Sequence, residues 1–399
     1  MRIVLFFCIV LFAPQLFLMC GEKARSHQRI VYQGPPIRTL EKRADMVLNV
    51  GKVGLNRRQL ILGFRFIESK TKECVNFYTV HESRIPCLIE RSELFHGFLL
   101  RSIQSKEAFI GRGCFKKVSK VILYGPQPKV LAECSAPLDE KHEIDILEQI
   151  RGGEGIVPYY GAVFRERKIL SYYEYFPQGS IGSLFARNKP LDLLQTVKIF
   201  HDIAKGVRVL HEKGLVHRDL HEANVLVDIT SQRCIGALID FGFTVLAENA
   251  NDGTVQGAVY RCPPEPLVDD LATIDRYAVD VYALGTLLYQ AVWGKMVSWA
   301  GVYDIHVLHK YPLSERKELY ERIVSLYEAS LEQDVGTAIQ KSQSGYPLTN
   351  LEKIQLLIYQ MLDVVPERRP SIAKVSSVLE VILESMPEDE QNVESALSP

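Results

Sequence analysis

The sequence predicts an α+β fold in which strands precede a larger helical part. Short apolar runs bounded by polar turns, at 156–161 and 168–173, are typical of strands. Between residues 194 and 210 an apolar side chain recurs every three or four positions, which predicts one long helix that ends at Gly214. Residues 280–289 are apolar on almost every side and predict a helix in the centre of the second part.

Composition allows one large domain or two smaller ones, because 47% of the 399 residues are hydrophobic and 24% are charged. The formal net charge is −1, so no global field attracts nucleic acid or an acidic membrane, and we expect no nucleic-acid partner. The eight cysteines include no Cys-x-x-Cys pair, which argues against a zinc site.

Several segments lie outside the main fold. Residues 1–21 contain an apolar run, 3–19, that is typical of a secretory signal or a membrane anchor. We therefore expect membrane association or entry into the secretory pathway; the alternative is a buried N-terminal helix in a cytoplasmic protein. Residues 22–45 predict a basic linker and residues 46–107 a small β-rich extension of unknown role. The end of the chain, 386–399, predicts an acidic tail.

Two short stretches carry the residue types that phosphoryl transfer needs. Residues 216–226 read Val-His-Arg-Asp-Leu-His-Glu-Ala-Asn-Val-Leu, and residues 238–242 read Leu-Ile-Asp-Phe-Gly. This reaction asks a protein mainly to position two oxygens and to neutralise charge around the moving phosphoryl group. Asp219 can take the proton of a hydroxyl group, while Asn224 and Asp240 can hold metal ions on the phosphates. Apolar residues beside them predict a hairpin of two short strands.

These stretches resemble the catalytic loop and the magnesium-binding loop of protein kinases. Four further segments resemble kinase motifs in the same order, namely the glycine-rich loop, the hinge, the substrate-binding segment and an arginine segment, at 109–118, 174–180, 257–265 and 361–371. The resemblance covers residues 108–385 and implies a two-lobed protein kinase fold with a small β-rich N-lobe and a large helical C-lobe. It also implies ATP and Mg²⁺ as cofactors and a protein substrate.

The resemblance assigns roles residue by residue. It implies that Asp219 is the catalytic base, that Asn224 and Asp240 bind Mg²⁺, and that Tyr173 is the gatekeeper. The ATP-binding positions that it implies are Ile110, Gly111, Gly113, Lys116, Val118, Ala132, Glu174, Phe176 and Leu226. Of these, Glu174 and Phe176 lie in the hinge and would bind adenine through their backbone groups.

The chain departs from the family at the strand lysine that normally holds the phosphates. That position is Cys134, and a lysine, Lys116, stands at the third glycine position of the glycine-rich loop. The with-no-lysine kinases carry the same pair of changes. The resemblance therefore implies that Lys116 supplies the catalytic cation and that Glu143, on a predicted helix, orients it; Glu148 is the alternative to Glu143.

Two readings of function remain open from the sequence. One is an active kinase, favoured because the base and both metal ligands are present; the other is a pseudokinase that acts as a nucleotide-binding scaffold. His221 replaces the lysine that serine/threonine kinases place after the base, and Ala258 replaces a threonine of the substrate-binding segment. We expect Ser/Thr acceptors, with Tyr as the alternative. Arg218 offers a cationic site for a phosphate group on the loop after Gly242. Thr254 is the first candidate for phosphorylation and Thr244 the second.

The C-terminal part carries two further expectations. The resemblance implies that Asp280, at the start of the central helix, accepts hydrogen bonds from the backbone of the catalytic loop. A buried aspartate at this position would be costly without such partners. The resemblance also implies that Arg369 pairs with Glu265.

Overall fold

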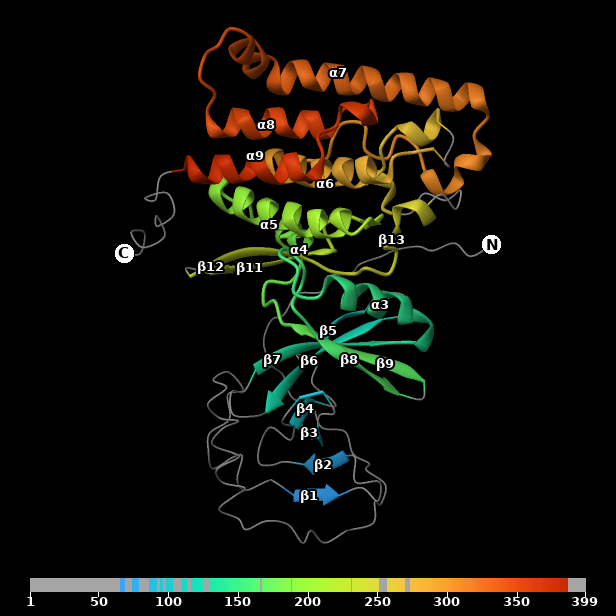
Figure 1. Cartoon of the computed structure of the whole chain (residues 1–399), viewed down its shortest axis with the longest axis vertical. Helices are drawn as coiled ribbons and strands as arrows, with labels where there is room; N and C mark the ends of the chain where they lie inside the picture. Colours follow the sequence, from blue (N-terminus) through green and yellow to red (C-terminus); the bar gives the residue numbers. More distant parts are fainter. Residues whose placement is uncertain are drawn as a thin grey trace. The chain divides into compact units, whose positions relative to one another are not determined.

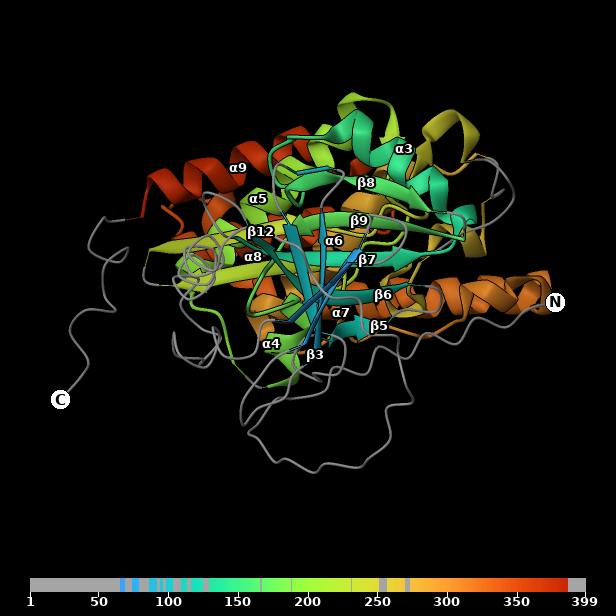
Figure 2. The same cartoon turned by 90° about the horizontal axis from the view of Figure 1, so that it is seen from below.

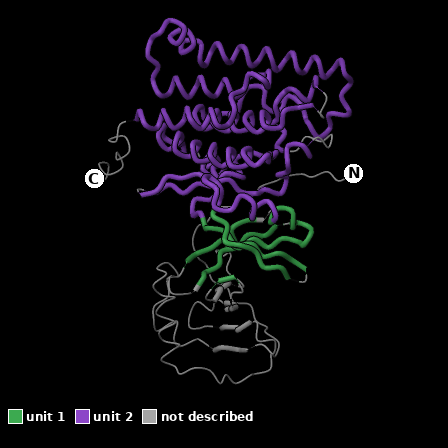
Figure 3. The backbone as a smooth tube through the Cα atoms, viewed as in Figure 1, with its two compact units in different colours: residues 1–144, 158–175 green, residues 145–157, 176–399 purple. Residues whose placement is uncertain are grey.

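The computed structural model describes residues 65–68, 74–78, 86–91, 94–95, 98–102, 109–112, 116–124, 129–165, 167–187, 189–230, 232–250, 257–269 and 273–386. They belong to two compact units, which Figure 3 colours separately: residues 1–144 with 158–175 form unit 1, and residues 145–157 with 176–399 form unit 2. The predicted signal or anchor 1–21 and the basic linker 22–45 lie outside the described residues. Among those described, no helix combines the length and apolarity that crossing a bilayer requires.

Unit 1 is built on one nine-stranded antiparallel sheet. Its strands are β1 (Arg65–Glu68), β2 (Cys74–Tyr78), β3 (Pro86–Arg91), β4 (Phe98–Ser102), β5 (Phe109–Arg112), β6 (Lys117–Tyr124), β7 (Lys129–Ala136), β8 (Tyr159–Arg165) and β9 (Lys168–Glu174). The order is β1-β2-β3-β4-β6-β7-β9-β8, and β5 pairs with β6. Figure 2 shows β6, β7, β9 and β8 side by side. The strands predicted for the extension are therefore present, and β4 joins them to the same sheet as β6.

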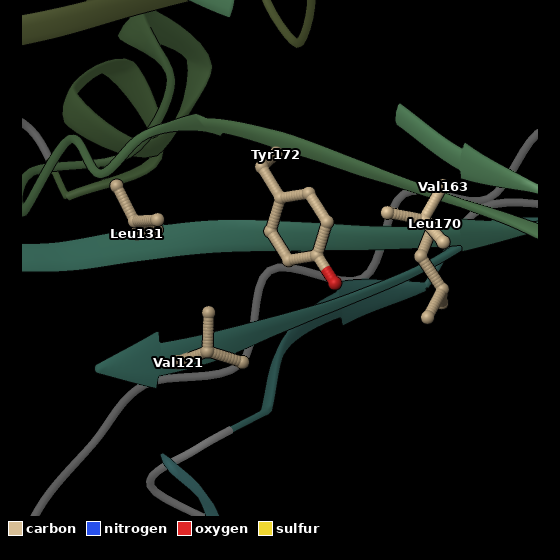
Figure 4. Close-up of a cluster of buried hydrophobic side chains, with 5 residues drawn as sticks. All are labelled: Val121, Leu131, Val163, Leu170 and Tyr172. Carbon is tan, nitrogen blue, oxygen red and sulfur yellow. The ribbon is translucent and has the colours of Figure 1, made fainter. Parts of the chain in front are cut away.

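One face of this sheet carries an apolar cluster. Its buried members, drawn in Figure 4, are Val121, Leu131, Val163, Leu170 and Tyr172. Phe95, from the segment that joins β3 to β4, packs against this cluster. Its ring lies 5.6 Å from that of Tyr172 and 6.2 Å from that of Tyr160, both edge to face. The extension thus contributes to the core of unit 1.

Unit 2 is mainly helical, as predicted. Its helices are α4 (Ile181–Ala186), α5 (Leu193–Glu212), α6 (Arg276–Trp293), α7 (Leu313–Gln343), α8 (Asn350–Met361) and α9 (Ile372–Glu384). They lie in layers in Figure 1, with α5 next to the hairpin of β11 (Val225–Thr230) and β12 (Arg233–Leu238). A second small ladder pairs β10 (Leu215–Val216) with β13 (Val245–Leu246). Helix α3 (Lys141–Ile150) contributes residues to both units.

Short 3₁₀ turns complete the described secondary structure. They are Leu138–Glu140, Ala247–Asn249, Val259–Arg261, Glu265–Leu267, Ile305–Lys310 and Pro366–Arg368.

Local sequence explains the ends of the helix that leads to the catalytic loop. Asp192 caps α5, since its side chain accepts from the Gln195 backbone while the Gln195 side chain accepts from the Asp192 backbone. The chain leaves α5 through Gly214 at φ 71°, a left-handed conformation that suits glycine. The predicted helix and its end are confirmed.

Helix α7 has 31 residues and was not predicted from the sequence. It is mostly exposed, and the carboxylate of Asp334 attaches it to two other helices. Asp334 Oδ2 accepts hydrogen bonds from the hydroxyls of Tyr289 on α6, at 3.0 Å, and Tyr359 on α8, at 2.8 Å. Burial and the nearby Asp334 raise the pKa of both tyrosines, so both remain donors.

Replacing Phe95 with alanine should weaken unit 1, because the change removes a ring that covers the apolar cluster. We expect the opening free energy of β6 and β9, measured by amide hydrogen exchange, to fall by about 2 kcal/mol. The control is Phe164→Ala on β8, whose side chain is 51% exposed; this change should cost less than about 0.5 kcal/mol. Equal exchange in the two variants would contradict a packing role for Phe95.

Candidate active site

The catalytic loop of unit 2 is held by one buried carboxylate. Asp280, on α6, is 1% exposed, and its two oxygens accept the backbone N–H groups of His217 at 2.8 Å and Arg218 at 2.9 Å. His211, at the end of α5, lies 3.0 Å from Oδ2 of the same carboxylate. These bonds outweigh burial and keep the pKa of Asp280 below its usual value. The expectation for Asp280 is confirmed.

This anchor supports an unusual backbone. Arg218 and Asp240 have φ values of 69° and 62°, and they are the non-glycine residues with positive φ in the described chain. Such a conformation is costly away from glycine, so surrounding contacts must hold it. It occurs directly before Asp219 and at the aspartate predicted to bind metal, which is where strain is expected in a functional site.

Asp219 has its two carboxylate oxygens in different surroundings. Oδ2 accepts from the side-chain amide of Asn224 at 3.2 Å and lies 3.5 Å from Nε2 of His221. Oδ1 lies towards the substrate-binding segment, since a Cβ added to Gly257 would be 3.7 Å from it.

His221 is oriented by the loop backbone. Its Nδ1 accepts the backbone N–H of Ala223 at 3.2 Å, so a neutral ring carries its proton on Nε2, the nitrogen that faces Asp219. Burial lowers the pKa of His221, but the hydrogen bond to Asp219 and the charges of Asp219, Glu222 and Asp240 outweigh burial and raise it. His221 thus favours the cationic form more than an ordinary histidine does.

Asn224 and Asp240 meet at the start of the β11–β12 hairpin. The backbone N–H of Ile239 donates to the carbonyl of Asn224 at 3.0 Å, which places Asp240 one residue from this contact. The Asn224 amide also donates to the Asp219 carbonyl at 3.0 Å, which leaves its oxygen to face a ligand. One carboxylate and one amide oxygen fit Mg²⁺, which takes few protein ligands and completes its shell with water and phosphate.

Lys116, predicted to replace the strand lysine, pairs with Glu143 on helix α3. Nζ of Lys116 lies 2.8 Å from Oε2 of Glu143, and their side chains are 18% and 8% exposed. An ion pair so little exposed to water is far less screened than a surface pair. Glu148, the alternative, instead pairs with Arg151.

The sheet register explains which residues accompany this pair. Val118 lies opposite Cys134, and Ala132 lies opposite Tyr173. Opposed residues share a face, and alternate residues of one strand do too, so these four side chains line the sheet face opposite the apolar cluster. Burial, then the charges of Glu143 and Cys134, raises the pKa of Tyr173 well above its usual value. Tyr173 therefore stays protonated beside the Glu143 carboxylate.

The remaining predicted nucleotide contacts fall into two groups. Ile110 and Gly111 lie on β5, Ile110 being exposed, whereas Gly113 lies outside the described residues. The backbone N–H of Glu174 donates to the carbonyl of Pro158 at 2.9 Å, so this N–H is already engaged. In unit 2, Phe176 is buried and Leu226 lies on β11.

The two ends of the substrate-binding segment are held differently. Arg369 reaches both oxygens of Glu265 at 2.8 Å, in a pair whose side chains are at most 1% exposed, and this expectation is confirmed. Nearer the start, Arg261 and Tyr260 both bind Glu222, a network that we did not predict. The sequence shows an acid in the catalytic loop and an arginine in the segment, but these complementary charges do not by themselves specify the pairing.

The second phosphorylation candidate is wrong for this conformation. The side chain of Thr244 is fully buried and unavailable to a kinase. Thr254 lies outside the described residues.

The fold and this catalytic loop define a phosphotransferase domain of the kinase class. The protein kinase domain family matches residues 105–379, and the chain belongs to that family. Its relatives include the serine/threonine-protein kinase STE11 of Saccharomyces cerevisiae, 30% identical over 39% of this chain and 21% of that protein. Serine/threonine-protein kinase cst-1 of Caenorhabditis elegans is 28% identical over 47% of this chain and 37% of that protein.

A third relative comes from Arabidopsis thaliana. It is an inactive leucine-rich repeat receptor-like serine/threonine-protein kinase, 26% identical over 67% of this chain and 39% of that protein. The matches thus span less than half the length of these three relatives.

Replacing Arg369 with glutamine should strongly destabilise unit 2, because it leaves the Glu265 carboxylate buried without its cation. We expect the free energy of unfolding to fall by ~3–5 kcal/mol. Trp293 and Trp299 both belong to unit 2, so tryptophan fluorescence in a urea titration measures the change. Arg208→Gln, which breaks an exposed pair with Glu212, is the control and should cost about 0.5 kcal/mol. Similar losses in both variants would contradict the expectation.

Proposed function

We propose that this protein is an active protein kinase that transfers the γ-phosphoryl group of ATP to a protein hydroxyl, with serine or threonine as the acceptor. The observation that carries the proposal is the anchored catalytic loop, in which Asp280 holds the backbone and Asn224 holds Asp219. Asp219 accepts the proton of the attacking hydroxyl as its oxygen bonds to phosphorus. Serine/threonine kinases among the relatives support the acceptor class.

Asn224 and Asp240 would hold Mg²⁺ on the nucleotide phosphates. The metal would neutralise charge on the leaving group as the bond between the β,γ-bridging oxygen and phosphorus breaks. The chain's own part is to present the two oxygen ligands from a rigid hairpin, whose backbone bond between Ile239 and Asn224 sets their separation.

Lys116 takes the place of the strand lysine in this proposal. The support is its ion pair with Glu143 at 2.8 Å, together with the register that puts Cys134 on the same sheet face as the adjacent Val118. A cation held in advance by a carboxylate needs little reorganisation when phosphate charge arrives, and preorganised charge is a major source of catalysis. The backbones of Glu174 and Phe176 would bind adenine.

The second candidate function is a pseudokinase that binds nucleotide as a scaffold. One relative is described as inactive, which is the observation in its favour. The retained base and metal ligands favour the active form. Asp219 and Asn224 are buried polar groups, and apolar residues of similar size could stabilise the fold equally well. A protein without catalytic activity would therefore have no need to keep them.

The apolar run of residues 3–19 also enters the proposal. It favours delivery of the chain to a membrane or into the secretory pathway, with a cytoplasmic chain as the alternative. Fractionation of the full chain beside a chain starting at Ala24 separates the two, since only a targeting segment changes the distribution.

Phosphoryl transfer by the purified full chain is the direct test of function. We expect transfer from radiolabelled ATP to a generic protein substrate only with Mg²⁺, and at least a ~10³-fold loss in Asp219→Asn, which removes the base. ATP should raise the melting temperature of both proteins when Mg²⁺ is present. Binding without transfer in the parent would favour the pseudokinase, and neither binding nor transfer would refute both candidates.

Lys116→Ala should lower kcat by ~10²–10³, the scale of losing one preorganised charge. Cys134→Ala should change kcat much less, and it is the matched control from the same sheet face. The double change Lys116→Gly with Cys134→Lys should recover part of the loss if Glu143 can hold the new lysine. If Lys116→Ala leaves kcat unchanged while Asp219→Asn abolishes transfer, a group other than Lys116 supplies the positive charge that binds the phosphates.

A further inference from the structure

The first half of the substrate-binding segment is joined to the catalytic loop by Glu222. Nη2 of Arg261 donates to Glu222 Oε2 at 2.8 Å, and the hydroxyl of Tyr260 donates to Oε1 at 3.0 Å. Both carboxylate oxygens of Glu222 are therefore engaged by two consecutive residues of the segment. The carboxylate belongs to a residue three positions after the predicted base, Asp219.

Arg261 is an internal residue. Its side chain is 2% exposed, its Nη2 also donates to Gln290 on α6, and its guanidinium lies 5.2 Å from the centre of the Tyr260 ring. The arginine therefore links three parts of unit 2: the segment, the catalytic loop and the central helix. A single guanidinium can do this because its donors are rigid and diverge in one plane.

Glu222 is itself held from the other side. Its carbonyl accepts the backbone N–H of Gly182 at 3.0 Å, and a Cβ on Gly182 would come within 2.8 Å of the Glu222 side chain. The Glu222 carboxylate accepts from Arg261 at 2.8 Å and from the Tyr260 hydroxyl at 3.0 Å. Glu222 is thus a fixed point to which the segment attaches.

Further described contacts hold the far end of the segment. Arg369 binds Glu265, and the Tyr303 hydroxyl donates to the Pro263 carbonyl. Ala258 has no side-chain group that could bond to the catalytic loop. Tyr260 and Arg261 therefore provide the described side-chain links between the first half of the segment and the catalytic loop.

We propose that Arg261 is a positioning residue for the protein substrate: by binding Glu222 it sets the first half of segment 257–265 against the catalytic loop and neutralises the partly exposed carboxylate of Glu222. This inference rests on the proposed kinase function and adds which substrates the site takes. Because Glu222 is already paired with Arg261, a basic residue next to the acceptor gains no ion pair with it. The parent protein should therefore bind neutral and basic acceptor peptides equally well.

Removing the guanidinium has two consequences that a purely structural role would not produce. The segment loosens, so protein substrate binds less well while ATP binding is unaffected. Glu222, which keeps 26% of its side chain exposed, also becomes an unmatched anion and attracts basic peptides.

The test compares the full-length parent with Arg261→Gln, Arg261→Lys and Glu222→Gln. We expect Arg261→Gln to raise KM for a neutral peptide about tenfold, as for one lost charged hydrogen bond, with KM for ATP within about twofold. It should also prefer an arginine-containing peptide over the neutral one by about fivefold. Arg261→Lys should restore much of the parent's behaviour, and Glu222→Gln should loosen the segment without any basic preference.

Hydrogen exchange and a control make the outcome decisive. Amides of 257–261 should exchange faster in Arg261→Gln than in the parent, while those of α5 and α8 remain unchanged; this readout needs no turnover and also shows that the variant is folded. Lys205→Gln, which breaks an ion pair with Glu154, should change neither KM nor exchange.

If Arg261→Gln leaves the peptide KM, the peptide preference and the hydrogen exchange unchanged, the inference is wrong. The proposed function still stands in that case, provided that the parent protein transfers phosphate. A parent without any transfer would overturn the proposed function, and a substrate-positioning role would fall with it even if exchange changed.

Discussion

The carboxylate of Asp280 is the constraint on which the catalytic geometry depends. It sits at 1% exposure inside α6 and accepts two consecutive backbone N–H groups of the catalytic loop. A buried charge without partners would be strongly unfavourable, so the loop and the helix must form together. As a result, Arg218 is held in a left-handed conformation, and the side chain of Asp219 lies near Asn224 and Gly257.

In unit 1, the ion pair between Lys116 and Glu143 lies beside the paired strands β6 and β7. In an antiparallel sheet, residues directly opposite one another share a face. Val118 and Cys134 are such a pair, and Lys116 directly precedes Lys117, the first residue of β6. Glu143 then sets the ammonium position.

Guanidinium groups hold both ends of the substrate-binding segment, in different ways. Arg369 binds Glu265 through two parallel bonds, the geometry that best offsets the cost of burying both charges. Arg261 shares one nitrogen between Glu222 and Gln290, and Glu222 remains partly exposed. The first pair secures the fold, while the second lies where the segment meets the catalytic loop.

The sequence alone determined the α+β class, the kinase resemblance, the long helix after Asp192 and the pairings of Asp280 and Arg369. The class and the helix depend on local periodicity. The two pairings follow from the kinase resemblance, because each partner lies in a recognisable motif although 63 and 104 residues separate the partners. Only the tertiary structure decided that β4 joins the extension to the same sheet as β6, that α7 runs for 31 residues, that Thr244 is buried and that Arg261 binds Glu222. The physical reason is that each of these depends on contacts between residues distant in sequence, whose partners no local pattern specifies.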